Sequence, residues 1–95
     1  MKLSITNEAA QWYKEEMNLR DGDSLQFFVQ LYGQSVHPNY SLGIARNEKP
    51  LNISYHSIVE GINFYIGEED KWFFEDYHVS VTIFNNEVTY DFKPL

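Results

Sequence analysis

Short stretches in which apolar and polar residues alternate recur along the chain, and they predict a protein built mainly of β-strands. The clearest stretch is 25–32, and a second stretch at 40–44 is expected to pair with it in antiparallel fashion. The stretches 53–55 and 62–66 flank the turn residues Glu60-Gly61. This arrangement predicts a hairpin.

Another hairpin and a turn of helix are predicted in the last third of the chain. Residues 77–83 and 88–92 alternate, and Asn85-Asn86 between them is a two-residue turn that tolerates positive φ. The acid-rich segment 68–76 has neither a clear helical period nor a clear strand period. The acids at its start favour a helical turn, because they suit the positive end of a helix dipole.

One amphipathic helix is predicted near the start of the chain. Residues 3–5 alternate as a short strand, and Thr6 is a favourable N-cap, so the helix is expected to begin near Asn7. We expect it to end within 19–23, which contains Gly22 and turn-forming acids. The apolar face of this helix consists of Ala9, Trp12, Tyr13 and Met17. The predicted class is mainly β, of the α+β type, with the helix covering the sheets.

Length, charge and cysteine content restrict the possible functions. A chain of 95 residues supports one hydrophobic core, so residues 1–95 are expected to form a single domain. The net charge of −7 repels phosphate backbones and anionic lipids, which argues against nucleic acid and membranes as partners. No apolar run suits a secretory signal or a membrane span, so a cytoplasmic protein is expected. The absence of cysteine excludes disulfides and thiolate-ligated metals or clusters.

Several short segments follow, in order and spacing, the pattern of a known family. The segment 3–10 has a short strand, a threonine and paired alanines, and the strand 25–32 is followed by a loop from Gly33 and by Tyr40-Ser41-Leu42. Residues 80–92 form the expected last hairpin. In these features the chain resembles the HesB-like, A-type iron–sulfur carriers. The resemblance implies a HesB-like fold of two overlapping, curved sheets, antiparallel or mixed, with an N-terminal helix packed on them.

The cluster ligands of that family have no counterpart in this chain. Alignment on Tyr40 puts Ser35 in the place of the first cysteine ligand, and the later cysteine pair is missing. A serine hydroxyl is too hard and too weakly acidic to replace a thiolate on an iron–sulfur cluster. We therefore expect no cofactor. Together with the absence of cysteine, the resemblance implies a non-enzymatic HesB-like protein with a role near iron–sulfur cluster assembly.

The histidines offer an alternative, which is a metal-binding carrier. His37 lies in the loop that corresponds to the family's ligand loop, where it could bind iron or zinc together with side-chain oxygens. No two histidines have the short spacing of a metal-binding motif. Surface positions are the simpler explanation for His56 and His78, and a long turn between strands is the simpler explanation for the loop around His37.

A cluster of aromatic residues is the candidate interaction surface. Four aromatics within six residues cannot easily all face one small core, and the acids among them suit a basic partner or a second copy of the chain. The alternative is a sheet covered on both faces, with aromatics on either side. The candidate residues are Trp72, Phe73, Phe74 and Tyr77.

No sequence pattern indicates an enzyme. The chain has no Gly-x-Ser-x-Gly motif, no calcium-loop spacing and no phosphate-binding glycine-rich loop. The leading hypothesis is therefore a non-enzymatic module that binds an unidentified protein partner. Edge strands such as 3–6 and 88–92 offer places for pairing, so a homodimer is also considered.

Overall fold

The residues that the structure describes form two mixed β-sheets and two α-helices. The computed structural model describes residues 2–32, 39–46 and 50–95. The first sheet has the order β1-β6-β7, with β1 at Lys2–Ile5, β6 at Tyr77–Phe84 and β7 at Glu87–Pro94. The second has the order β3-β2-β5-β4, with β2 at Ser24–Tyr32, β3 at Asn39–Arg46, β4 at Ile53–Val59 and β5 at Ile62–Gly67. The helices are α1 at Asn7–Glu16 and α2 at Lys71–Asp76, which follows a 3-10 turn at Glu68–Asp70.

The strand pairing confirms the mainly β, α+β class that the sequence predicts. All three expected antiparallel pairs are present, namely β2 with β3, β4 with β5 and β6 with β7. Two further pairs are parallel, with Leu3 of β1 opposite Val79 of β6 and Leu25 of β2 opposite Phe64 of β5. These parallel pairs join segments that are distant in the sequence, and they make both sheets mixed.

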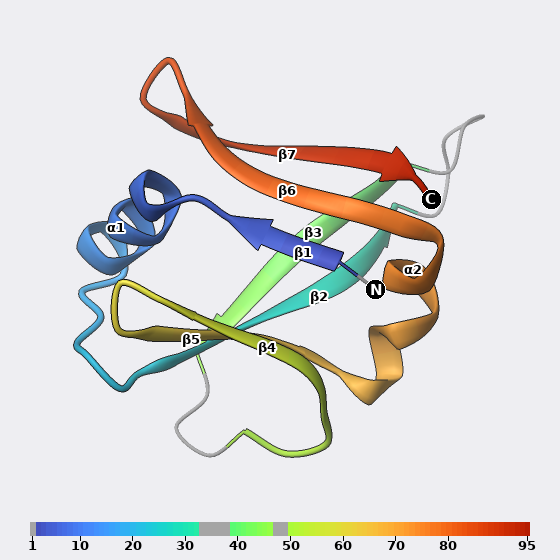
Figure 1. Ribbon diagram of the computed structural model, residues 1–95, viewed down its shortest axis with the longest axis horizontal. Coiled ribbons are helices and arrows are strands. Elements are labelled where there is room, and N and C mark those ends of the chain that lie inside the picture. The colour runs from blue at the N-terminus through green and yellow to red at the C-terminus, as the bar shows by residue number, and fades with distance from the viewer. Residues whose placement is uncertain (1, 33–38, 47–49) are drawn as a thin grey trace.

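The hydrophobic core is shared by both sheets and both helices. Figure 1 shows the three-stranded sheet lying across the four-stranded sheet, with α1 at one end of the molecule and α2 at the other. Phe27 of β2 stacks on Phe64 of β5 with ring centroids 5.9 Å apart, and its edge meets Tyr90 of β7 at 6.3 Å. Among the described residues, neither helix has the length and apolar sequence that a membrane crossing requires.

The start of α1 is as predicted. The Thr6 side chain caps the helix by accepting a hydrogen bond from the Ala9 backbone N–H at 3.1 Å. Ala9, Ala10 and Tyr13 are buried. Because alanine side chains are small, they let the helix lie close to the core, and the larger Tyr13 ring fills the space beside them.

The end of α1 differs from the prediction. The helix ends at Glu16, before the segment 19–23, because Asn18 adopts a positive φ of 54°. The backbone N–H of Leu19 then donates to the carbonyl of Lys14 at 2.9 Å, which is the bond of a Schellman motif. Asparagine tolerates this conformation better than most residues, so it takes the role that the prediction gave to Gly22.

The acid-rich segment 68–76 is helical, as predicted, and it is joined to β2 through Asp70. Strand β5 pairs with β2 only over Ser24–Phe27, and beyond this point the Asp70 carboxylate accepts a hydrogen bond from the Val29 backbone N–H. Burial raises the pKa of Asp70, and this hydrogen bond opposes the increase. The contact holds the α2 end of the molecule against the longer strand.

Candidate functional site

A groove of about 460 Å³ lies where α1 meets the β4–β5 turn and the β6–β7 hairpin. Three of its lining residues are glutamates, and none is a lysine, arginine or histidine. Its apolar lining comes from an indole and an isoleucine. We call it the α1 groove, and it is lined by Asn7, Glu8, Gln11, Trp12, Glu15, Glu60, Ile83 and Asn86.

The two turns beside the α1 groove contain residues with positive φ. In the β6–β7 turn, Asn85 and Asn86 have φ of 50° and 63°, and in the β4–β5 turn, Glu60 and Gly61 have φ of 51° and 78°. Positive φ at both central residues is the requirement of a type I′ turn, and the sequence predicts both turns correctly. Asparagine and glycine accept such angles readily, whereas glutamate does so at a cost. Glu60 is therefore strained at the edge of the groove.

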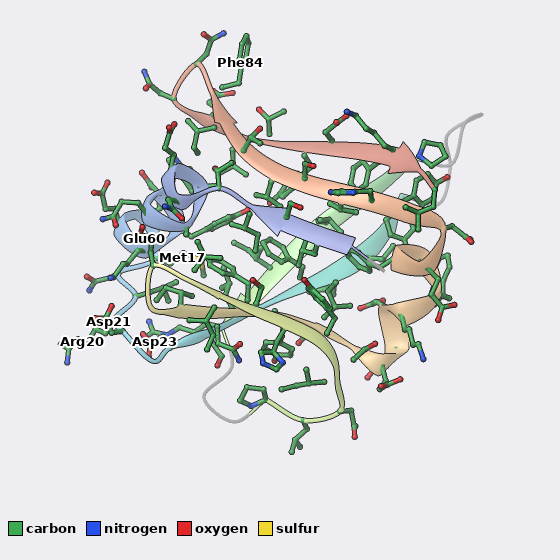
Figure 2. The ribbon with its side chains drawn as sticks, in the orientation of Figure 1. Met17, Arg20, Asp21, Asp23, Glu60 and Phe84 are labelled. Atoms are coloured by element: carbon green, nitrogen blue, oxygen red, sulfur yellow. The ribbon has the colours of Figure 1, made fainter. Side chains whose placement is uncertain are left out.

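Lys14 ties the β4–β5 turn to α1. Its Nζ donates to Oδ1 of Asp21 at 2.6 Å and to the carbonyl oxygen of Glu60 at 3.2 Å. The backbone N–H of Gly22 donates to the carbonyl of Gly61 at 2.8 Å. A Cβ atom on Gly61 would lie 2.5 Å from Oδ1 of Asp21, so a side chain there would displace the carboxylate that Lys14 binds. Figure 2 shows Asp21 and Glu60 at the same end of the molecule.

Two basic residues near this network are paired with aspartates. Lys14 is bound to Asp21, and Arg46 donates from Nη2 to Oδ2 of Asp23 at 3.1 Å. Within the described ranges, no lysine or arginine forms an ion pair with the glutamates of the α1 groove. The groove glutamates therefore have no direct ion-pair partner among these residues.

Trp12 packs against Tyr13, which is in turn hydrogen-bonded to Tyr90. Its ring meets Tyr13 edge to face, with centroids 5.2 Å apart, and the Tyr13 hydroxyl shares a hydrogen bond with the hydroxyl of Tyr90. Burial raises the pKa of both hydroxyls, so both tyrosines are neutral at physiological pH. The tyrosine pair joins α1, which carries Trp12, to β7.

The predicted aromatic surface is divided between the core and the exterior. Phe73 and Phe74 are 2% and 0% exposed, whereas Trp72 is 50% exposed and Tyr77 is partly buried. Phe73 stacks on Tyr77 with centroids 5.0 Å apart and meets Phe92 at 5.7 Å. Successive residues of a helix face different directions, so α2 can bury Phe73 and Phe74 while it exposes Trp72. The accessible part of this cluster is Trp72 with part of Tyr77.

The histidines are not brought together by the described part of the fold. Ser35 and His37 lie outside the described residues. His56 is exposed on β4, and His78 lies on β6 in the other sheet, where its Nε2 is 3.1 Å from Oγ of Ser4. In the ranges that the structure describes, no three acidic or histidine side chains form a group that could hold a metal ion.

Local sequence patterns do not predict the α1 groove, because its residues come from three separate segments. Trp12 is predicted only as part of the apolar helix face, and the structure places it there partly buried. The available signal is that Glu8, Gln11 and Glu15 recur at helical spacing beside this indole. The contribution of Glu60 becomes visible only when β4 and β5 are placed next to α1.

Comparison with known proteins identifies relatives of the same length. The chain is 37% identical to a Bacillus subtilis (strain 168) protein named pyruvate dehydrogenase inhibitor, over 86% of each chain. It is 32% identical to an uncharacterized protein of Staphylococcus saprophyticus, over 98% of this chain and 100% of the other. No family model matches the chain, and no solved structure matches it significantly. The chain belongs to the family of the Bacillus subtilis pyruvate dehydrogenase inhibitor.

This membership corrects the family suggested by the sequence. The resemblance to HesB-like carriers is wrong, since no such family model matches and the named relative is an inhibitor. The predicted role near iron–sulfur assembly and the alternative of a metal carrier using His37 are wrong for the same reason. The matching segments are short, and the resemblance depends on their order and spacing and not on a specific motif. The prediction that the protein is not an enzyme is confirmed by the inhibitor name.

Proposed function

We propose that this protein binds pyruvate dehydrogenase and lowers its activity, acting as a regulatory protein without catalysis of its own. The observation that carries the proposal is the 37% identity to a protein named pyruvate dehydrogenase inhibitor, over 86% of both chains. Identity at this level over most of a small protein preserves the fold and supports a shared partner. The proposal treats residues 1–95 as one domain that acts in the cytoplasm.

The α1 groove is the proposed contact surface for the enzyme. An inhibitor without catalytic groups must act through contact, and tryptophan is among the residues that contribute most to protein interfaces. The groove combines Trp12 and Ile83 with polar and acidic residues, and interfaces likewise combine an apolar centre with a polar edge. Phe84 at the tip of the β6–β7 hairpin is 69% exposed and projects outward in Figure 2, which extends the available surface.

The exposed side of α2 is the second candidate contact surface. Trp72 is half exposed there. The ring of Phe73 contacts both Trp72 and Tyr77 and so links the two residues. This surface lies at the other end of the molecule from α1 in Figure 1. A standard protein interface covers one end of a molecule of this size more easily than both ends. Variants at the two surfaces can therefore show which of them contacts the enzyme.

The test is an activity assay with pyruvate dehydrogenase purified from the organism that supplies this chain. Adding the protein is expected to lower turnover of pyruvate in a saturable manner. Trp12→Ala is expected to weaken the inhibition at least tenfold, as is typical of an interface hot spot. Trp72→Ala is expected to inhibit like the natural protein. Circular dichroism of each variant checks that it is folded.

The control for Trp12 is the conservative variant Trp12→Phe. It keeps an aromatic ring packed on Tyr13, so it distinguishes loss of the contact with the enzyme from loss of the folded structure. Enzyme that keeps full activity at a large excess of the natural protein, with no association in analytical ultracentrifugation, would disprove the proposal. Loss of inhibition in Trp72→Ala instead of Trp12→Ala would move the contact surface to α2.

A further inference from the structure

The charge of the α1 groove is one-sided. Glu8 and Glu15 approach it from α1, and Glu60 approaches from the β4–β5 turn. The other polar lining residues are amides, and one of them, Gln11, donates to Oε1 of Glu15 at 3.3 Å. Among the described residues, no ion pair involves any of the three glutamates. A bound group that supplies positive charge would therefore gain attraction without breaking an existing salt bridge.

The backbone keeps Glu60 at the groove. Lys14 donates to the Glu60 carbonyl oxygen and to the Asp21 carboxylate, and its ion pair is with Asp21. Asp21 is 79% exposed and lies outside the groove lining. The Glu60 carboxylate forms no ion pair with Lys14, while the turn that carries it is fixed to α1.

The apolar part of the groove suits a particular kind of cation. An indole attracts cations through its π system more strongly than the other aromatic rings, and arginine is the side chain most often found in such contacts. The aliphatic part of an arginine or lysine can lie along apolar surface while its charged end meets carboxylates. Trp12 and Ile83 provide that surface, and the three glutamates line the same groove.

We propose that the α1 groove receives a cationic segment of the partner protein, with an arginine side chain over Trp12 and further basic groups opposite Glu8, Glu15 and Glu60. This inference rests on the proposed function in that it takes the occupant to be a protein. A nucleic acid or an anionic membrane would be repelled by the same glutamates, and a second copy of the chain carries the same net charge of −7. Charge complementarity therefore favours a basic surface of a different protein.

The test uses the whole chain and a synthetic peptide in which arginine and alanine alternate around one leucine. Trp72→Phe leaves Trp12 as the only tryptophan, so its fluorescence reports on the groove. The expected result is a saturable change in fluorescence with amide NMR shifts confined to the groove. Affinity is expected to fall at least tenfold between about 0.05 M and about 0.5 M salt, because exposed charges are screened.

Two matched triple variants separate local from general attraction. The groove variant combines Glu8→Gln, Glu15→Gln and Glu60→Gln. It is expected to weaken peptide binding about tenfold, which corresponds to about 1.4 kcal/mol of binding free energy shared among three exposed ion pairs. The control combines Glu68→Gln, Glu69→Gln and Glu75→Gln, which changes the net charge equally at the α2 end. The control is expected to bind like the natural protein.

Equal weakening in both triple variants would overturn the inference, since the attraction would then depend on net charge alone. Binding of an equivalent peptide with glutamate in place of arginine would also overturn it. Inhibition of pyruvate dehydrogenase that is unchanged in the groove triple variant would leave the proposed function standing and remove the cationic occupant. Specific peptide binding without any inhibition of the enzyme would support the cationic site and remove the proposed function.

Discussion

The hydroxyl of Tyr13 on α1 shares a hydrogen bond with the hydroxyl of Tyr90 on β7, although the two residues are 77 positions apart in the chain. Both rings reach the space between the sheets, where Phe27 meets each of them edge to face. The pair satisfies two polar groups that the core would otherwise leave without a partner. It also joins the helix of the α1 groove to the last strand.

The first prediction concerns this tyrosine pair. Tyr13→Phe is expected to lower the free energy of unfolding by about 1–2 kcal/mol, because the Tyr90 hydroxyl loses its partner in a partly buried position. Urea unfolding followed by circular dichroism measures the change. Tyr77→Phe is the control and is expected to cost less than about 0.5 kcal/mol, as is typical where no buried bond is lost. Equal losses in both variants would contradict the assigned role of the bond.

The second prediction is a loss of stability in alkaline solution. The pKa values of Tyr13 and Tyr90 are raised above 10.0 in the folded state, mainly by burial. Above that pH the unfolded chain releases these protons first, so stability is fully present below about pH 10 and falls as the pH rises. Urea midpoints at increasing pH measure the slope. The double variant Tyr13→Phe and Tyr90→Phe should show a shallower slope; an unchanged slope would exclude the pair as its source.

The third prediction concerns the end of α1. Asn18→Ala is expected to lower the free energy of unfolding by about 1 kcal/mol, because the left-handed conformation at φ 54° is less favourable for alanine than for asparagine. Asn18→Gly should remain within about 0.5 kcal/mol of the natural protein, since glycine adopts this angle freely. Thermal unfolding of both variants is the measurement. A glycine variant as unstable as the alanine variant would show that the asparagine side chain itself stabilises the helix end.

The fourth prediction concerns the contact between the β4–β5 turn and the loop after α1. Gly61→Ala should destabilise the protein by at least about 1–2 kcal/mol, from the positive φ and from the clash with Asp21. Gly22→Ala also has a positive φ, but its added Cβ meets open space, so it should cost less. Asp21→Ala alone measures the cost of losing the ion pair with Lys14, and the Gly61→Ala change should cost less in that background because the clash is absent. Equal unfolding free energies for the two glycine variants would argue against the clash.

The fifth prediction is a conflict between stability and binding at Glu60. Glu60→Asn creates the Asn-Gly pair that type I′ turns favour, and it should raise the free energy of unfolding by about 0.5–1 kcal/mol. The same change removes a carboxylate from the α1 groove and should weaken binding of the arginine peptide. Chemical denaturation and peptide titration on one sample measure both effects. A variant that gains stability and binds equally well would exclude Glu60 from the contact.

Local patterns predicted most of the fold and little of the site. Alternation located the hairpins, and Thr6 marked the helix start, because these features depend on neighbouring residues. The end of α1 differs from the prediction because Asn18 supplies the left-handed angle that glycine usually supplies. The parallel pairing of β1 with β6 and the approach of Glu60 to α1 depend on the tertiary arrangement. No local sequence pattern predicts these contacts, so the α1 groove is visible only in the folded structure.

The parallel pairing of β1 with β6 also restricts the order in which the protein can fold. Lys2 lies opposite His78, so the first strand has no partner in its sheet until most of the chain has been synthesised. The β2–β3 and β4–β5 hairpins can form earlier, because their strands are neighbours in the sequence. Closing the three-stranded sheet requires a long loop, and contacts of this kind slow folding. The start of the chain should therefore be the last part to gain protection from amide hydrogen exchange during refolding.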